Sequence, residues 1–260
     1  MLKKRIIPKL QMSLRQSYRG PRPVLVVTRN FESKRAIGDP LSQAKIYEAQ
    51  LADELIFVDL ERTEESWSVM LSTLSSMSSS LATPLAVGGG ITRLEQVQEL
   101  LDKGADKIIL NSAAVERPQL ITEVANKYGS QCIIVSIDAR RKGSTYTVLT
   151  ECGSKDTGYD PIEWGKRCAE FGAGEIMITS IEHDGTSMGL DLRLIENACR
   201  KISVPIIGSG GCGLSEHFVK GFDTGASAIG AGSFFSQKDQ NPMQCRSHVR
   251  NGQHPIRLEV

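Results

Sequence analysis

Side chains that could transfer a proton follow short apolar runs of this chain. Asp138 ends the apolar run Val135–Asp138, and a carboxylate at the end of a buried strand is a candidate general acid or base. Roles as an N-cap or turn residue are the alternative for the carboxylates, above all for Asp59. The other candidates, which also come directly after apolar runs, are Gln11, Asp59, Thr179, Ser180 and Asp184.

Glycine-rich segments after four of the runs could bind phosphate. Glycine lets backbone N–H groups approach an anion closely, and a Ser or Asn at a helix start adds a donor. Two such segments in each half of the chain suit a ligand phosphorylated at both ends, although tight turns without a ligand are the alternative. The candidate phosphate and substrate residues are Gly90, Asn111, Ser112, Thr179, Asp184, Gly185, Ser209, Gly211, Gly232 and Ser233.

An internal repeat positions these residues. Matching segments recur at one constant offset of 121 residues, and three matches at one offset indicate that the second half copies the first. The matching pairs are Ala52–Asp59 with Ala173–Ser180, Pro84–Gly90 with Pro205–Gly211, and Gly104–Ser112 with Gly225–Ser233.

Four apolar runs in each half predict buried parallel strands, with helical patterns between them. We expect a helix that begins at Asp39-Pro40 and a second with a capping box at Thr92 and Glu95. The predicted strands are Ile6–Leu10, Leu55–Val58, Leu85–Val87, Ile108–Leu110, Ile133–Ile137, Ile176–Thr179, Ile206–Gly208 and Ala228–Ala231.

Four β/α units, twice over, predict an α/β fold: a single (β/α)8 TIM barrel over residues 1–260, with half-barrels at about 1–125 and 126–250. A doubly wound open sheet is the alternative, but it has no reason to repeat. In such barrels the chemistry lies where strands end and the following loops begin.

Composition excludes several classes of protein. The 31 Lys and Arg balance 30 Asp and Glu, for a net charge of +1, which argues against a nucleic-acid binder. No apolar stretch is long enough for a membrane span or a signal peptide. The 6 cysteines form no C-x-x-C pair and the 4 histidines no cluster, so we expect reduced thiols in the cytoplasm, no metal and no cofactor.

The chain resembles the cyclase subunit of imidazole glycerol phosphate synthase over nearly its whole length. The segments that carry the resemblance are Lys4–Pro8, Ala52–Asp59, Val87–Ile91, Gly104–Lys107, Asn111–Val115, Gly129–Ile133, Ile137–Ala139, Asp184–Thr186 and Ser209–Gly211. The resemblance implies a lyase-type barrel of histidine biosynthesis that receives ammonia from a glutaminase. It cleaves and cyclises a ribotide phosphorylated at both ends, giving imidazole glycerol phosphate and an aminoimidazole carboxamide ribotide.

The chain departs from this family at the end of the first strand. The family uses two catalytic aspartates; Asp138 matches the second, but Gln11 stands at the first. Gln has no titratable proton, and the loss of such a group costs about 10²- to 10⁴-fold in rate. Arg19 replaces a ligand-binding lysine of the family, the loop over Arg29–Arg35 is longer and more basic, and we expect a weak last helix broken by Pro242 and Pro255.

A ring of alternating charges is retained. In the family such a ring gates an ammonia channel at the N-terminal mouth of the barrel, where the glutaminase, a class I amidotransferase, docks. The matching positions here are Arg5, Glu54, Lys107 and Glu175. A salt-bridge cluster that only stabilises the barrel is the alternative.

Two hypotheses follow. In the first, the chain is a divergent paralogue, with cyclase activity reduced or lost, that docks a glutaminase and passes ammonia to another acceptor such as an N-acetyl sugar amidotransferase. In the second, it is an active cyclase with Asp138 as the sole catalytic carboxylate. A scaffold that binds phosphorylated ligands without conducting ammonia, or another phosphate-binding barrel enzyme such as a sugar-phosphate isomerase, would be a further alternative.

Overall fold

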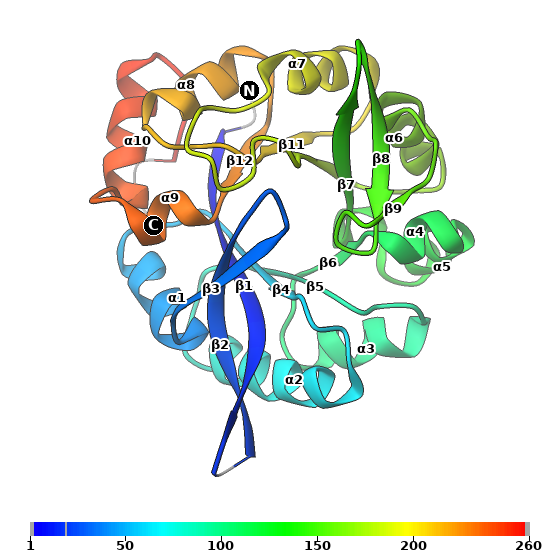
Figure 1. The fold of residues 1–260 in the computed structure, drawn as a ribbon, viewed down its shortest axis with the longest axis vertical. Helices are drawn as coiled ribbons and strands as arrows, with labels where there is room; N and C mark the ends of the chain where they lie inside the picture. Colours follow the sequence, from blue (N-terminus) through cyan, green and yellow to red (C-terminus); the bar gives the residue numbers. More distant parts are fainter. Residues whose placement is uncertain (1–2, 19, 258–260) are drawn as a thin grey trace.

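Eight parallel strands close into a barrel surrounded by helices in this computed structural model, which describes residues 3–18 and 20–257. The predicted TIM barrel is confirmed. The strands pair in the order β10-β11-β12-β1-β4-β5-β6-β7, and β7 pairs with β10 to close the sheet (Figure 1). The barrel strands are β1 (Arg5–Ser17), β4 (Leu55–Asp59), β5 (Leu85–Gly88), β6 (Lys107–Leu110), β7 (Ile133–Lys142), β10 (Glu175–Ser180), β11 (Ile206–Ser209) and β12 (Ala228–Ala231).

Side chains alternate between the two faces of each barrel strand. On β1, Ile6 and Leu10 point outward into the large core shared with the helices, whereas Ile7 points into the barrel. Eight inward residues, one from each barrel strand, form a separate apolar layer across the interior. That layer consists of Ile7, Ile56, Ala86, Ile109, Ile134, Met177, Ile207 and Ala228, and each is at most 5% exposed.

Two strands extend well beyond the barrel, which the sequence did not predict. β1 continues to Ser17 because it pairs antiparallel with β2 (Gly20–Arg29), which in turn pairs with β3 (Ser33–Gly38). β7 continues to Lys142 because it pairs with β8 (Thr145–Thr150), beside the short β9 (Lys155–Asp156). Each half of the chain therefore begins with a long strand and an antiparallel hairpin, and the β1–β2 hairpin projects from the lower edge of the molecule in Figure 1.

Helices pack around the barrel between its strands (Figure 1). They are α1 (Pro40–Ala49), α2 (Glu64–Ser78), α3 (Leu94–Asp102), α4 (Ser112–Glu116), α5 (Gln119–Tyr128), a short 3₁₀ helix (Ser130–Cys132), α6 (Pro161–Glu170), α7 (Leu192–Lys201), α8 (Glu216–Asp223), α9 (Ser233–Gln237) and α10 (Pro242–Asn251). The proposed division of the halves near residue 125 falls within α5.

Helix starts follow the sequence with two corrections. As predicted, Asp39 caps α1 by accepting a hydrogen bond from the Ser42 backbone at 2.7 Å. The expected capping box of Thr92 and Glu95 is wrong, because the Gln96 side chain accepts from the Thr92 backbone instead. The expected break at Pro242 is also wrong.

Pro242 begins α10 rather than breaking it. A proline is tolerated in the first turn because its missing N–H would have no partner there. The Asn241 side chain caps the helix by accepting from the Gln244 backbone at 2.9 Å. The helix is anchored to the barrel by a buried ion pair between Arg246 and Asp53.

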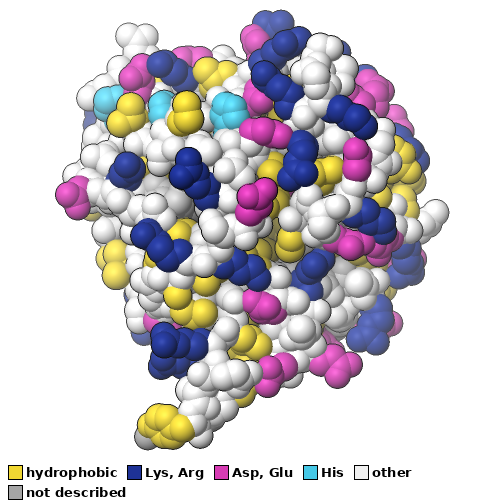
Figure 2. All heavy atoms as spheres, in the orientation of Figure 1, with side chains coloured by type: hydrophobic (Ala, Val, Ile, Leu, Met, Phe, Trp, Pro, Cys, Tyr) yellow, Lys and Arg dark blue, Asp and Glu magenta, His cyan; other side chains and the backbone are white. Residues whose placement is uncertain are grey.

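The surface carries mixed charge. On the face shown in Figure 2, Lys and Arg side chains are interspersed with Asp and Glu, and no large area has a single sign. None of the helices in the described part of the chain is both long and apolar enough to cross a membrane.

Candidate functional site

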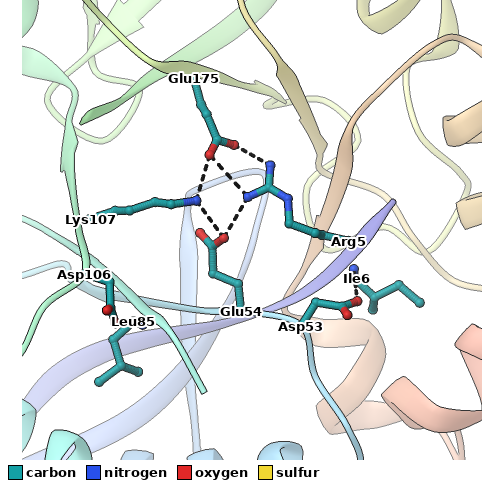
Figure 3. Close-up of polar contacts among 8 residues, drawn as sticks. All are labelled: Arg5, Ile6, Asp53, Glu54, Leu85, Asp106, Lys107 and Glu175. Carbon is teal, nitrogen blue, oxygen red and sulfur yellow. Dashed lines mark hydrogen bonds and ion pairs between the residues drawn. The ribbon is translucent and has the colours of Figure 1, made fainter. Parts of the chain in front are cut away.

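Four charged side chains close the N-terminal mouth of the barrel. Arg5 donates to Glu54 at 2.7 Å and also to Glu175. Lys107 donates to Glu54 at 2.8 Å and to Glu175 at 2.7 Å. Each cation therefore bridges both anions, and the four form the closed, charge-neutral ring seen in Figure 3.

Burial and pairing act against each other in this ring. Burial disfavours the charged forms of Glu175 and Arg5, but the pairing outweighs it. Thus Arg5 and Lys107 lower the pKa of Glu175, and the bonds to Glu175 and Glu54 raise the pKa of Arg5. The Glu54 side chain is only 4% exposed, and its Oε1 has no hydrogen-bond partner among the described residues. Both cations bind its Oε2 instead.

Carboxylates beside the ring fix the strands that carry it. Asp53, next to Glu54, accepts from the Ile6 backbone at 2.8 Å. Asp106, next to Lys107, accepts from the Leu85 backbone at 2.8 Å (Figure 3). The ring residues are thus held by the ends of neighbouring strands. The apolar layer led by Ile7 lies directly above them, because it is one step further along the same inward faces.

The C-terminal mouth opens into a cavity of about 470 Å³, large enough for a small-molecule ligand. A second, narrower cleft lies beside it on the side of β11 and β12, and Lys9, Gln11 and Thr28 line both spaces. All the predicted phosphate and substrate residues that the structure describes line one or the other. Arg19 lies outside the described residues.

Asp138 is in the position that general acid–base chemistry needs. It lies at the rim of the larger cavity and is only 8% exposed. Burial raises its pKa to about 6, while the nearby Lys9 charge and a hydrogen bond from Asn111 at 2.9 Å oppose the shift. A carboxyl group with a pKa near 6 can accept and return a proton near neutral pH.

Gln11 lies on the strand that faces Asp138 across the mouth. Its register partners are Val58 of β4 and Val26 of β2, and it lines both cavities. Gln11 is therefore inside the candidate site, and its amide side chain has no acid function to contribute.

Three candidate phosphate-binding residues of the first half of the chain, Gly90, Asn111 and Ser112, lie at the ends of β5 and β6 and form the first-half cradle. Gly90 has φ +70° and Gly89 has φ +109°, and a Cβ at Gly89 would lie 2.3 Å from the Asp59 carbonyl oxygen, so only glycine fits. Asn111 donates to both Asp138 and the Ser136 carbonyl, while Ser112 begins α4 and its hydroxyl accepts from the Glu151 backbone. The cradle is thus linked to the acid–base candidate.

Four candidate phosphate-binding residues of the second half of the chain lie at the ends of β11 and β12 and form the second-half cradle. They are Ser209, Gly211, Gly232 and Ser233. Gly211 has φ +108°, and a Cβ there would lie 2.1 Å from the Gly189 carbonyl oxygen. Gly232 precedes Ser233, the first residue of α9. Ser209 is 2% exposed and accepts a hydrogen bond from Lys9 at 3.1 Å. Together they line the narrower cleft.

The β2–β3 hairpin is bound to the loop after β10. Thr28 donates to the Asp184 carboxylate at 2.8 Å, and the Asn30 backbone donates to the Asp184 carbonyl at 2.9 Å. Gly185 has to be small, because a Cβ would lie 2.1 Å from the Thr28 carbonyl oxygen. Burial raises the pKa of Asp184, opposed by Lys9 and Thr28. The segment that carries Thr28 and Phe31 therefore forms part of the wall of the site.

Asp59 has a structural role although it also lines the larger cavity, and Ser180 lines neither cavity. Asp59 accepts from the backbones of Glu61 and Arg62 and from the Ser66 hydroxyl, so it caps the loop, as the alternative interpretation predicted. Ser180 is 2% exposed, and its hydroxyl has no partner among the described residues. Thr179 lines the larger cavity.

Sequence reasoning missed Lys9 and Thr28. Lys9 shares the inward face of β1 with Ile7 and Gln11, a signal that the two-residue period of a strand carries. Thr28 gave no such signal, because its strand pairs outside the barrel. No group of three or more His, Cys, Asp or Glu residues in the described ranges could hold a metal ion.

Comparisons with known proteins agree with this geometry. A family model described as "Histidine biosynthesis protein" matches residues 6–241. A curated protein of Prochlorococcus marinus (strain MIT 9313), named "Putative imidazole glycerol phosphate synthase subunit hisF2", is 63% identical over 260 residues, which is 100% of both chains.

Proposed function

The chain belongs to the histidine biosynthesis protein family, and from this membership we propose that it is the barrel subunit of an ammonia-transferring complex with little cyclase turnover of its own. The observation that carries the proposal is the contrast between the complete charged ring at one mouth and Gln11 at the other. The proposed glutaminase partner docks at the N-terminal mouth, around the ring.

The ring suits a gate because it is closed without a partner. Among the described residues, the four side chains bond only to one another across the mouth. A docking protein that draws the Lys107 ammonium aside would open the axis and leave Arg5 to pair with both carboxylates. Beyond the ring lies the apolar layer, which excludes the ammonium ion by its desolvation cost but not neutral ammonia.

The C-terminal mouth supports ligand binding more than turnover. The first-half cradle lines the cavity of about 470 Å³, and the second-half cradle lines the cleft beside it, as a small molecule phosphorylated at both ends would need. Asp138 is the one titratable group of the expected catalytic pair, since Gln11 cannot protonate or deprotonate a substrate. With one of two acid–base groups missing, we expect cyclisation to be about 10²- to 10⁴-fold slower than with both.

The proposed acceptor of the ammonia is therefore a third protein, such as an N-acetyl sugar amidotransferase, rather than the ribotide. An acceptor of this class would compete with the ribotide for ammonia that leaves the C-terminal mouth.

Two assays on one preparation test the proposal. The purified chain is mixed with a class I glutaminase, and glutamate release from glutamine is measured. We expect stimulation by the wild-type chain and by Arg117→Ala, an exposed control paired with Glu123. We expect none by Lys107→Ala, which leaves two ring carboxylates with one cation and so disturbs the mouth where the partner docks. The same preparation, given ribotide and ammonium, should form little imidazole glycerol phosphate. Normal cyclase turnover, or stimulation that survives Lys107→Ala, would overturn the proposal.

A working cyclase is the second candidate function, and the pKa of about 6 for Asp138 favours it. A single carboxyl group with that pKa could serve as acid and base in turn. In that case Asp138→Asn abolishes formation of imidazole glycerol phosphate, while Gln11→Ala changes it little. Equal activity of the wild type and Asp138→Asn would remove this candidate.

A further inference from the structure

Lys9 occupies the centre of the C-terminal mouth. It lies on the inward face of β1, one layer above Ile7 and one below Gln11. Its backbone pairs with Ile56 of β4, and its side chain lines both the large cavity and the narrow cleft.

A glycine of β12 makes room for the lysine stem. Gly230 lies against Lys9, and an atom at its Cβ position would be only 3.4 Å from Lys9 Cδ. A side chain larger than alanine at Gly230 would therefore overlap the stem. Gly232, one inward position further on, also faces Lys9, with its Cβ position 3.5 Å from the Lys9 carbonyl oxygen. The two glycines direct the ammonium group toward the second-half cradle.

The ammonium group has unused donors. It gives one hydrogen bond, to Ser209 at 3.1 Å, and makes no other to the described residues. A lysine ammonium has three N–H donors. Burial raises the pKa of both Asp138 and Asp184, and both are close enough for the Lys9 charge to oppose that rise, yet neither forms an ion pair with Lys9 in the described chain. Gln11 is uncharged, so Lys9 is not neutralised from its own strand.

We propose that Lys9 is a ligand-binding residue that pairs with the phosphate monoester held in the second-half cradle. The backbone groups of Gly211 and Ser233 would bind the phosphate from one side and Lys9 from the other, through charge-assisted hydrogen bonds. The inference rests on the proposed phosphate role of that cradle. It adds a specificity: the second cradle prefers a dianion, because the Lys9 ammonium bonds to Ser209 on that side of the mouth. The first cradle relies on Gly90, Asn111 and Ser112.

A titration with glycerol 3-phosphate tests the proposal, because the probe carries a phosphate monoester that is dianionic at pH 7.5. Amide resonances of Gly211 and Ser233 report the second cradle of the full-length chain, and those of Gly90 and Ser112 report the first. We expect Lys9→Met to raise Kd at the second cradle by about 10- to 100-fold, the loss of a charge-assisted hydrogen bond, and to leave Kd at the first unchanged.

Lys34→Met is the matched control. Lys34 also lines the large cavity, but it is exposed at the rim and bonds to Glu61 at 3.2 Å. This variant should leave the second cradle as it is. Unchanged Kd at Gly211 and Ser233 in a folded Lys9→Met protein, or no binding at the second cradle of the wild type, would overturn the proposal.

A crystal structure of the wild type with glycerol 3-phosphate gives a test that needs no variant. We expect Lys9 Nζ within hydrogen-bond distance of a phosphate oxygen, and a phosphate bound with Lys9 still on Ser209 alone would contradict the proposal. Because glutaminase stimulation depends on the opposite mouth, a failed phosphate test leaves the proposed ammonia transfer standing, and the reverse also holds.

Discussion

The two mouths of the barrel are built from the same eight strands but differ in how their polar groups are satisfied. At the N-terminal mouth Arg5, Lys107 and Glu175 find their partners within the ring. At the C-terminal mouth Lys9 makes one hydrogen bond and Asp138 has its pKa raised by burial. Apart from Glu54 Oε1, the ring residues are paired with one another in the described chain, whereas the second mouth has hydrogen-bond donors left for a ligand.

The largest expected effect comes from restoring the missing acid at the C-terminal mouth. Gln11→Asp should raise the rate of imidazole glycerol phosphate formation from ribotide and ammonium by about 10²- to 10⁴-fold. The reason is that it supplies a second acid–base group, across the mouth from Asp138. Steady-state kinetics of wild type, Gln11→Asp and Gln11→Asn measure the gain. Equal rates for the Asp and Asn variants would show that other parts of the site have also diverged.

Breaking the N-terminal ring should cost stability. Glu54→Gln keeps the shape of the side chain but removes the charge that both Arg5 and Lys107 bind through Oε2. Removing one partner of a buried ion pair costs about 3 kcal/mol. Urea unfolding measures the free energy of unfolding, and a loss below about 0.5 kcal/mol would mean that the ring is as weak as an exposed pair.

The pH dependence of stability tests whether Asp138, at the C-terminal mouth, is buried without full compensation of its charge. The pKa of Asp138 is raised from 3.8 to about 6 in the folded chain. The contribution of the protonated Asp138 carboxyl to the free energy of unfolding is therefore fully present below pH 3.8 and is lost as the pH rises through about 6. Asp138→Asn should remove this loss, which is at most about 2 kcal/mol between about pH 4.5 and 7.5.

Urea unfolding of both proteins at the two pH values tests this prediction. The wild type should lose more stability than Asp138→Asn as the pH rises. If the two proteins respond alike, Asp138 is not the buried acid that the geometry indicates.

The smallest effect is expected at an exposed ion pair. Glu196 and Arg200, on α7, pair at 2.6 Å with side chains 45% and 73% exposed. Glu196→Gln should change the free energy of unfolding by no more than about 0.5 kcal/mol. Comparison of the losses in free energy of unfolding of Glu196→Gln and Glu54→Gln separates the effect of burial from that of losing any ion pair.

Much of the fold could be predicted from local patterns. The apolar runs predicted every barrel strand, to within a few residues except for the far ends of β1 and β7, which extend into hairpins. Those extensions could not be predicted, because the length of a strand outside the barrel is set by the neighbouring strand that pairs with it. The Pro242 error was avoidable, since Asn241 and Gln244 around it form a capping box.

The candidate site was predicted in its residues but not in its connections. Gly90, Asn111, Ser209 and Asp138 were named from their places after apolar runs, and each lines a cavity at the C-terminal mouth. The contact of Thr28 with Asp184 joins positions 156 residues apart. No local pattern encodes such a contact.

By itself the sequence determined the strands, the repeat and the direction of each side chain, because the alternation of Cβ positions along a strand is local. It therefore placed Arg5, Ile7, Lys9 and Gln11 on one face of their strand. The tertiary structure alone decided which partners these side chains contact. Arg5 finds Glu54 and Glu175, 49 and 170 residues away, and Lys9 finds Ser209, 200 residues away. These contacts exist only because the barrel closes with one particular register between its strands.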